Sequence, residues 1–445
     1  MEKEVLKRYS AAEIVLLGIF ALGLGLSLVL VKVRGRIEAG EPVELPGSGL
    51  SAALPKGSEW ETAGGWRYES DNAYVLLGQM RSRGRAVMTV RWRYMLCDAA
   101  EESEVFLMGQ AERAHGQLEP LGVLPGAVAM TYGRIYVPSE SGEEFLVGVS
   151  HLGFGRRLEL TIGYQNDPLF AENAFRTLAQ GVVYERSALL EAGSERVSRY
   201  YKELAEQITA TNAQREAGFT IKDAAQRPVG YAVSRYFAYD GNGEGHLRVT
   251  ERQFESSGVY TESDFWLTGS DAAFTWKTKT WLPRVEEPRV VELHADGAGQ
   301  LSVQKHSERS QTFGRTPMML PAPLLSEFAA GQRDAEEAIM IDVLTGGGFV
   351  VPTRLRRVGP EESSIRSTNE VVIVRAEYFH AEGAYEDFVF DPSGRCLGRF
   401  EQPSRRPGRL WEAATEEQLR EIFGERFKPR GQESVRRGNG PLLTV

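Results

Sequence analysis

Histidines are the first residues to consider for chemistry, because imidazole serves both as a metal ligand and as a general base. The six in this chain are His115, His151, His246, His294, His306 and His380. None belongs to an HExxH or HxH motif, or to a spacing that would place two of them on one helix face. No GxSxG motif marks a nucleophilic serine. The chain is therefore predicted to be non-enzymatic, with no bound metal and no cofactor.

Glycine-rich and acidic segments support the same prediction. The run Gly346–Gly348 is not followed by the Gly-Lys-Ser/Thr of a phosphate-binding loop, so a turn between strands is the simpler interpretation. Glu361 and Glu362 are typical of solvated charge, because paired catalytic carboxylates need a cleft that a sequence does not reveal. An enzyme with an unrecognised site stays open as an alternative.

The segment from residue 266 to residue 281 has the most unusual local composition, with three tryptophans within sixteen residues. Its candidate pocket residues are Trp266, Phe274, Trp276 and Trp281. Two interpretations stay open. These side chains line an apolar pocket or a surface near a membrane, since Trp and Lys suit bilayer interfaces. Alternatively, they form the core of a sheet whose other face exposes Lys277 and Lys279.

Composition limits the partners of the chain. Lys and Arg number 52 against 61 Asp and Glu, and the formal net charge of −9 argues against a nucleic-acid surface. Cys97 and Cys396 are nearly 300 residues apart, so they form no disulfide framework or CxxC site, and whether they pair stays open. A chain of 445 residues is long enough for two domains.

An uncharged apolar run predicts a transmembrane helix over residues 13–32, preceded by a short tail at residues 1–12. The eighteen residues Ile14–Val31 would span roughly 27 Å as a helix, close to the hydrocarbon thickness of a bilayer. Small residues four positions apart on this helix permit close pairing, so self-association through the anchor helix stays open. The residues that define the predicted anchor are Ile14, Leu16, Phe20, Ala21, Gly25 and Val31.

The predicted location follows from this anchor. Basic residues flank the run almost equally, so the positive-inside rule hardly decides its orientation. We expect a single-pass protein of the bacterial inner membrane, with its tail in the cytoplasm and its bulk in the periplasm. Residues 33–48 are punctuated by Gly and Pro and are predicted to be a linker.

Residues 49–186 are predicted to form a mixed α+β domain. Alternating apolar side chains predict strands at Ala86–Leu96 and Arg157–Tyr164. Helical periodicity predicts helices near Ala100–His115 and Pro168–Ala179. Strands and helices that follow one another in this way are typical of the α+β class.

The opening of this domain, Leu50–Trp60 with the sequence LSAALPKGSEW, resembles the start of PsbP-like domains. The closing helix, with Ala171, Phe175 and Leu178 on one face, is also similar. PsbP-like domains are mostly binding and assembly modules, so the resemblance implies a function without catalysis.

Residues 187–214 are predicted to form a connecting helix. Val197, Tyr201, Leu204 and Ile208 recur at helical spacing and define one apolar face. This face packs on its own domain or offers a surface to a partner, and the sequence leaves both open.

Residues 215–403 are predicted to be a β-rich domain, because hairpin signals recur between alternating segments. Pro321 and Pro323 introduce one short helix. Many antiparallel strands with short turns favour a curved sheet or half-barrel around an apolar centre. The fold class expected for the whole chain is therefore α+β: the transmembrane helix, the mixed domain and this curved antiparallel sheet.

The second domain resembles the bacterial lipoprotein carriers of the LolA and LolB type, and the related sensor domain of RseB. The resemblance rests on the late hairpin Phe388–Leu397, on the Pro-led helix before a strand at Ala338–Leu344, and on the order of strands. In that family an incomplete barrel encloses an acyl-binding cavity, so the resemblance implies a hydrophobic pocket. An anchor and a whole extra domain depart from the family pattern.

Residues 404–445 are predicted to be a tail that contains one amphipathic helix. Thr415 and Gln418 form a capping box, and the Gly- and Arg-rich end Lys428–Val445 is typical of disorder.

Together these features predict a membrane-anchored, non-enzymatic bacterial envelope protein that binds a partner protein or an apolar ligand such as a lipid. The first alternative is a structural subunit of an envelope membrane complex, and the second is an enzyme.

Overall fold

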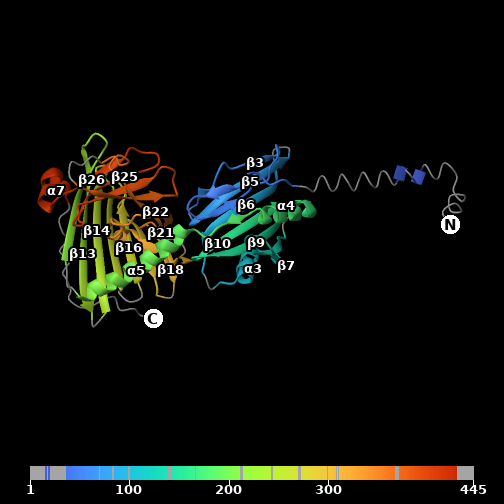
Figure 1. Ribbon diagram of the computed structural model, residues 1–445, viewed down its shortest axis with the longest axis horizontal. Coiled ribbons are helices and arrows are strands. Elements are labelled where there is room, and N and C mark those ends of the chain that lie inside the picture. The colour runs from blue at the N-terminus through green and yellow to red at the C-terminus, as the bar shows by residue number, and fades with distance from the viewer. Residues whose placement is uncertain are drawn as a thin grey trace.

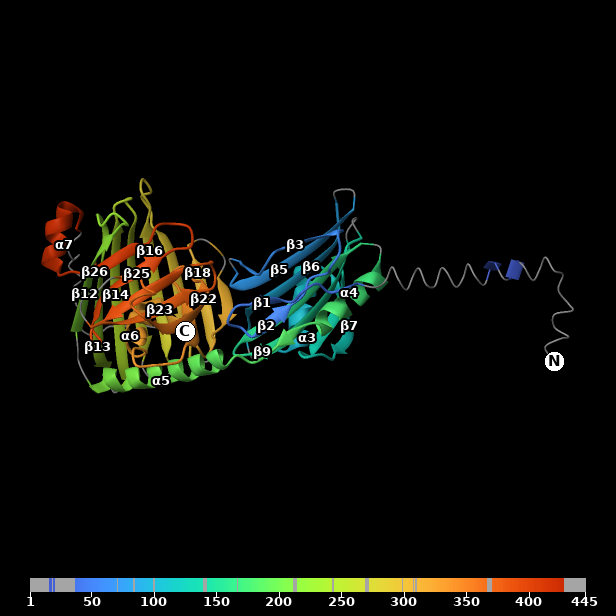
Figure 2. The ribbon, with the colours of Figure 1, turned by 45° about the horizontal axis from the view of Figure 1, so that its top comes forward.

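The computed structural model describes residues 16–17, 19–20 and 37–427, apart from 70, 83–84, 99–100, 139–141, 166, 211–213, 242–243, 269–271, 298, 307, 309 and 366–369. Two β-rich bodies lie side by side along the long axis of the molecule (Figure 1). The long helix α5 (Ala188–Ala210) leaves the first body and runs along the second (Figure 2).

The first body is built on one antiparallel sheet. Within the described residues, eight strands form it, in the order β3-β5-β6-β10-β9-β8-β7, with β4 beside β5. The strands are β3 (Trp60–Thr62), β4 (Arg67–Tyr68), β5 (Ala73–Ser82), β6 (Arg85–Leu96), β7 (Gln117–Leu124), β8 (Met130–Tyr136), β9 (Glu144–Gly153) and β10 (Arg156–Tyr164). β6 and β10 coincide with the two strands that side-chain alternation predicts, and they pair with each other.

Helices cover both faces of this sheet. α4 (Pro168–Gln180) begins where Asp167 accepts a hydrogen bond from the amide of Phe170 (3.1 Å), and it buries Phe175 completely on one face. α3 (Ser103–Arg113) packs on the opposite face. A small sheet of β1 (Val43–Leu45), β2 (Leu50–Ala52) and β11 (Val183–Tyr184) adds to the α4 side. The first body therefore has its core on both faces of one sheet.

The second body is one large curved sheet, fifteen-stranded in the part of the chain that the structure describes. Its order is β19-β18-β17-β16-β15-β14-β13-β12-β26-β25-β24-β23-β22-β21-β20, antiparallel except for the parallel pair β20–β21. The strands are β12 (Gln214–Lys222), β13 (Pro228–Gly241), β14 (Glu244–Glu255), β15 (Tyr260–Thr268), β16 (Ala273–Trp281), β17 (Arg289–Ala295), β18 (Gln300–Lys305), β19 (Gln311–Gly314), β20 (Met319–Pro321), β21 (Ile339–Leu344), β22 (Val350–Val358), β23 (Val372–Tyr378), β24 (Tyr385–Phe390), β25 (Cys396–Gln402) and β26 (Arg409–Ala413).

The inside of the curved sheet is filled by helices. Strands β14–β18 and β21–β24 contribute to one apolar cluster, together with α5 and the short helix α6 (Leu325–Ala330), which follows the 3-10 turn η2 (Ala322–Leu324). Val197, Leu204 and Ile208 of α5 are each at most 5 % exposed in this cluster. The apolar face of α5 therefore packs on the second sheet, chiefly on β21, β14 and β13.

A second, smaller apolar cluster lies on the outside of the sheet. There α7 (Glu416–Phe423) and the following turn η3 (Gly424–Arg426) bring Leu419 and Phe427 against Tyr231 and Val233 of β13. The side chain of Thr415 and that of Gln418 form the capping box that the sequence predicts.

The two edges of the large sheet, β19 and β20, are consecutive in the sequence. Both are covered. The Tyr201 hydroxyl on α5 donates a hydrogen bond to the main-chain oxygen of Met319 (3.2 Å). A Cβ on Gly314 of β19 would lie 1.9 Å from the carbonyl oxygen of Cys97 in the first body, so the two backbones are in direct contact. The first body and α5 therefore cover edges that would otherwise expose unpaired backbone groups.

The expected α+β class is wrong, because the protein is mostly β: strands account for 49 % of the structure and helices for 19 %. The predicted helices near Ala100–His115 and Pro168–Ala179 exist as α3 and α4, but long antiparallel strands make up most of the chain. Strands such as β9 (Glu144–Gly153) are buried on both faces over much of their length, so they lack the alternation from which strands were predicted.

The predicted transmembrane helix over residues 13–32 is also corrected. No helix in the described part of the chain is long and apolar enough to cross a membrane. The longest, α5, is amphipathic, with charged residues opposite its apolar face. Of the predicted anchor, Leu16 and Phe20 are described, whereas Ile14, Ala21, Gly25 and Val31 lie outside the described residues.

The packing of α5 predicts opposite effects for two Gly→Ala changes in helices. A Cβ on Gly193 of α5 would lie 1.7 Å from the carbonyl oxygen of Met340, whereas a Cβ on Gly109 of α3 meets only the Arg113 side chain, at 3.8 Å. We expect G193A to lower the free energy of unfolding by about 1–3 kcal/mol through overpacking. G109A should raise it by about 0.5–1 kcal/mol through helix propensity. Urea denaturation measures both, and a stabilised G193A would contradict this packing.

Candidate functional site

The two bodies meet through hairpin turns of the first and strands β21 and β22 of the second. Asn72, in the turn before β5, accepts a hydrogen bond from the amide of Val350 (2.8 Å) and donates one to the carbonyl of Gly348 (3.3 Å). The Tyr68 hydroxyl donates to the carbonyl of Val350 (2.9 Å). Asn72 has a φ of 61°, a left-handed conformation that asparagine tolerates better than most residues. This turn therefore hydrogen-bonds to the main chain of the second body at Gly348 and Val350.

A buried ion pair lies beside these contacts. Arg156, the first residue of β10, is 5 % exposed and bonds through Nη2 to the Oδ1 atom of Asp342 on β21, which is 1 % exposed. The second carboxylate oxygen of Asp342 accepts a hydrogen bond from the Thr316 hydroxyl (2.6 Å). Removing one member would leave the other charge buried without compensation. The pair therefore holds the two bodies together in one arrangement.

Tyrosines surround this ion pair. The Arg156 guanidinium lies 5.5 Å from the centre of the Tyr94 ring. Burial, opposed by the positive charge of Arg156, raises the pKa of Tyr94 to about 12, and burial also raises the pKa of Tyr68 and Tyr74. Burial alone would lower the pKa of Arg156, but the charge of Asp342 and these tyrosines outweigh it and raise it. The phenols stay neutral and the guanidinium stays charged at physiological pH.

Apolar side chains complete the junction. Leu190 of α5 packs with Met318 and Met340, and Phe154 and Phe379 join this cluster from the two bodies. Phe154 has a φ of 51° in the tight turn between β9 and β10. Such a strained turn persists where its surroundings hold it in place. Here the apolar cluster around Leu190 holds Phe154.

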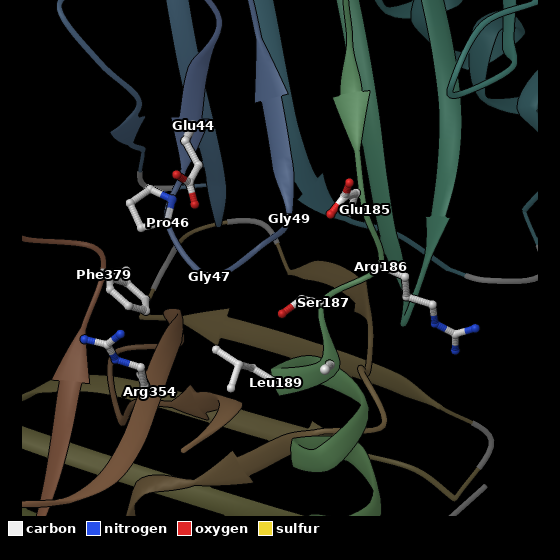
Figure 3. Close-up of a pocket in the computed structure, with 11 residues that line it drawn as sticks. Glu44, Pro46, Gly47, Gly49, Glu185, Arg186, Ser187, Leu189, Arg354 and Phe379 are labelled. Carbon is white, nitrogen blue, oxygen red and sulfur yellow. The ribbon is translucent and has the colours of Figure 1, made fainter. Parts of the chain in front are cut away.

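A pocket opens next to this cluster, and it is our candidate functional site (Figure 3). Its volume is about 470 Å³. Four segments line it: the β1–β2 turn, the stretch from β11 into α5, strand β22, and the residue after β23. The lining residues are Glu44, Pro46, Gly47, Gly49, Glu185, Arg186, Ser187, Ala188, Leu189, Arg354 and Phe379. Both bodies and their connecting helix therefore contribute to one concave site, the usual setting for a small-ligand pocket.

Charge and apolar surface are divided between the walls of the pocket. In Figure 3 the carboxylates of Glu44 and Glu185 come from the first body, whereas Arg354 and Phe379 lie across from them on the second. The Arg354 guanidinium lies 5.8 Å from the centre of the Phe379 ring. Leu189 adds an apolar side chain at the start of α5, and Arg186 points away from the other labelled side chains. Arg354 is already paired with Glu377 (2.5 Å). The site can therefore receive a positive group on the wall of Glu44 and Glu185, and an apolar group or a hydrogen-bond acceptor on the wall of Phe379 and Arg354.

The predicted aromatic pocket residues are divided between the two faces of the large sheet. Phe274 and Trp276 point inward into the core around α5, where they are 2 % and 5 % exposed. The Trp276 indole donates a hydrogen bond to the Ser263 hydroxyl (2.6 Å). Trp266 and Trp281 lie on the other face, where the Arg248 guanidinium sits 4.5 Å from the centre of the Trp266 ring. The structure therefore brings Phe274 and Trp276 together and separates both from Trp266 and Trp281.

Ionisable groups also lie inside the curved sheet. Glu386 pairs with Arg399 (2.9 Å) and accepts a hydrogen bond from the Tyr378 hydroxyl (2.9 Å). Arg399 stacks on Trp411, 3.4 Å from the centre of the ring. Burial raises the pKa of Glu386, although the charge of Arg399 opposes this. This group joins β23–β26 across the sheet.

Cys97 and Cys396 are free thiols, one in each body. Among the described residues, no group of three or more His, Cys, Asp or Glu side chains could hold a metal ion.

The residues that build the junction were missed from the sequence. Asp342 left one signal: it is the sole charged residue in the buried strand Ile339–Leu344, where every residue is less than 9 % exposed. A charge in such a strand needs a buried partner. Glu44 and Arg354 left no signal, because their segments are ordinary in composition and meet only in the fold.

No family model matches the chain, and no curated protein matches its sequence. Among solved structures, it is similar to a beta-barrel-like protein of the domain of unknown function DUF1849 from Brucella abortus, at 11 % identity and a TM-score of 0.31. That match covers 45 % of this chain and 95 % of the other. A second match, to the tail fiber of Staphylococcus aureus phage P68, has 11 % identity and a TM-score of 0.11, covering 83 % of this chain and 69 % of the other. The LolA/LolB/RseB and PsbP resemblances stay predictions.

The buried ion pair predicts a strongly non-additive double-mutant cycle. D342L alone should lower the free energy of unfolding by about 3–5 kcal/mol, because Arg156 is then buried without its counter-charge. In the double variant R156M/D342L both charges are gone, and most of that loss should be recovered. Denaturation followed by tryptophan fluorescence measures the cycle.

The control is E61Q in the exposed pair Arg81–Glu61 (3.0 Å), whose side chains are 52 % and 69 % exposed. It should change the free energy of unfolding by less than about 1 kcal/mol. Additive effects of R156M and D342L would contradict a coupled buried pair.

Proposed function

We propose that the protein is a non-enzymatic binding protein that holds a small ligand of mixed polarity in the pocket between its two bodies. The observation that carries the proposal is that the residues lining the pocket come from both bodies. Both bodies and the start of α5 contribute to one pocket of about 470 Å³, within the usual size range of ligand sites. The buried Arg156–Asp342 pair holds these walls at a set distance, so the site is formed before a ligand arrives.

The chemistry of the walls favours a zwitterion with an apolar part, such as a short peptide. Glu44 and Glu185 suit an ammonium group. Arg354 bonds to Glu377 through Nε and Nη2 (2.5 Å each), so its Nη1 atom is the one left to bond to a ligand carboxylate. Phe379 and Leu189 offer apolar contact between them. Each charged side chain is at least partly exposed, so a ligand can reach it without displacing core residues.

The sequence-based predictions of an apolar ligand, a partner protein and a bacterial envelope location are separate from this pocket, and they stay predictions. The inside of the curved sheet, where the resemblance to lipoprotein carriers would place an acyl chain, is occupied by α5 and α6. An acyl ligand there would have to displace α6, whose Phe328 is 1 % exposed and packs edge-on against Tyr200 (5.3 Å between ring centres). The pocket between the bodies needs no such rearrangement.

Filling the pocket should abolish binding without unfolding the protein. Ala188 lines the pocket at the exposed first turn of α5, so A188W places an indole in the cavity. Glu203, an exposed residue further along the same helix, provides the matched control E203W. Native mass spectrometry of protein purified without denaturation should show a bound small molecule in the wild type and in E203W, and none in A188W.

A second measurement uses known probes. Titration with short peptides, followed by heteronuclear NMR, should shift resonances of Leu189 and Phe379 in the wild type and leave those of A188W unchanged. Equal binding by wild type and A188W, or binding by neither wild type nor E203W, would contradict the proposal.

A further inference from the structure

Cys97 and His151 form a pair of side chains that the proposed function does not use. Cys97 follows β6, His151 belongs to β9, and the Cys97 sulfur lies 3.8 Å from Nδ1 of His151. The imidazole also hydrogen-bonds to the main chain of Glu101. In the tautomer that carries the ring proton on Nε2, Nδ1 is left to accept the thiol proton. The sulfur therefore lies next to a base whose ring is also bonded to the main chain.

The surroundings favour sulfur chemistry at this position. The guanidinium of Arg157, which is 1 % exposed, bonds to the Glu101 carboxylate (2.8 Å) and stacks on Phe106, 4.1 Å from the ring centre. Arg157 and Arg156 place positive charge near the sulfur, and Glu101 and Asp98 are the nearby negative groups. Positive surroundings stabilise the charge that develops on sulfur when its proton leaves.

Access limits what can react. Cys97 is 6 % exposed, whereas His151 beside it is exposed to solvent. Only a small reagent can approach the sulfur past the imidazole, while protons exchange freely between the imidazole and water. Burial raises the pKa of the Cys97 thiol and lowers that of His151, so the resting pair is a neutral thiol beside a neutral base.

We propose that Cys97, with His151 as its base, is a modification site at which small hydroperoxides oxidise the thiol. The sulfur attacks the nearer peroxide oxygen, so that an S–O bond forms while the O–O bond breaks. His151 takes the thiol proton and delivers it to the departing hydroxide or alkoxide, which leaves as water or an alcohol. Sulfur loses two electrons and the peroxide gains them, giving a sulfenic acid.

The chain holds its own reference thiol. Among the described residues, the hydrogen-bond partners of the Cys396 sulfur in the second body are the carbonyl oxygen of Gly398 (3.5 Å) and the Ser326 side chain, and burial raises its pKa. Variants C396S and C97S each leave one thiol, so that the rates of the two can be compared under the same conditions. His294, an exposed residue on β17, provides the control substitution H294Q.

The experiment treats the full-length variants with hydrogen peroxide and traps sulfenic acid with dimedone, read by peptide mass spectrometry. Cys97 in C396S should react faster than Cys396 in C97S, although it is the more buried thiol. Adding H151Q to C396S should slow Cys97 oxidation about 10²-fold, the usual contribution of a general base, whereas adding H294Q should leave it unchanged.

The pH profile provides a test that needs no histidine variant. Because burial and the charge of Arg157 lower the pKa of His151, its imidazole is neutral at pH 7 and becomes protonated only as the pH falls below the ordinary histidine value. The rate for Cys97 should therefore stay level above that value and drop below it, because the neutral imidazole is lost. In H151Q the remaining rate should follow the thiolate and fall steadily from alkaline pH downward, with no level region. Equal rates for the two thiols, no effect of H151Q, or a profile without that drop would each overturn the proposal.

Discussion

The buried ion pair between Arg156 and Asp342 is the interaction on which the arrangement of this molecule depends. Each member is almost fully removed from solvent, and its counter-charge lies in the other body. Separating the bodies would leave the two charges facing each other across an opening gap that water must refill. Val350 of strand β22 donates a hydrogen bond to Asn72 and accepts one from Tyr68, and these bonds add direction to this attraction. These contacts hold the two bodies in one arrangement, and they therefore also fix the walls of the pocket between them.

The large sheet has a second requirement, which the docking also meets. Twisted open sheets of this many strands usually curl or close, because their edges offer unpaired backbone groups to other chains. Here the curl is filled by α5 and α6, so the two wings of the sheet share one apolar core. The edges at β19 and β20 meet the first body and Tyr201 of α5. One interface thus serves both to position the bodies and to protect the sheet.

Local patterns predicted local structure well. β6 and β10 were predicted because Trp92 and Leu160 belong to runs in which apolar and polar side chains alternate, and the closing helix α4 because Phe175 lies on its single apolar face. The predicted fold class was wrong because many strands show no alternation of apolar and polar residues. A strand that is buried on both faces lacks it, and so does a strand that is exposed on both faces, such as the edge strand β7 (Gln117–Leu124). The predicted transmembrane helix rested on the length and hydropathy of one run, and no helix in the described part of the chain is long and apolar enough to cross a membrane.

The candidate site could not be predicted from the sequence for a different reason. Glu44, Ser187 and Arg354 come from segments more than a hundred residues apart, and each segment is unremarkable by itself. Their meeting depends on how two bodies dock, which no local periodicity encodes. Asp342 could have been identified from the sequence, because it is a charged residue in an otherwise apolar strand. Charged residues in otherwise apolar strands therefore deserve to be read as signs of a tertiary partner.

The covered edges have a consequence for the order in which the protein is made. Synthesis runs from the N-terminus, and domains generally fold as they emerge. The first body, which carries Cys97 and Arg156, is thus complete before β19 and β20 leave the ribosome. The central pairing of β12 with β26 must wait until almost the whole chain has been synthesised. During that interval the first body can already cover the edge at β19, whereas the edge of β12 stays unpaired until β26 is made.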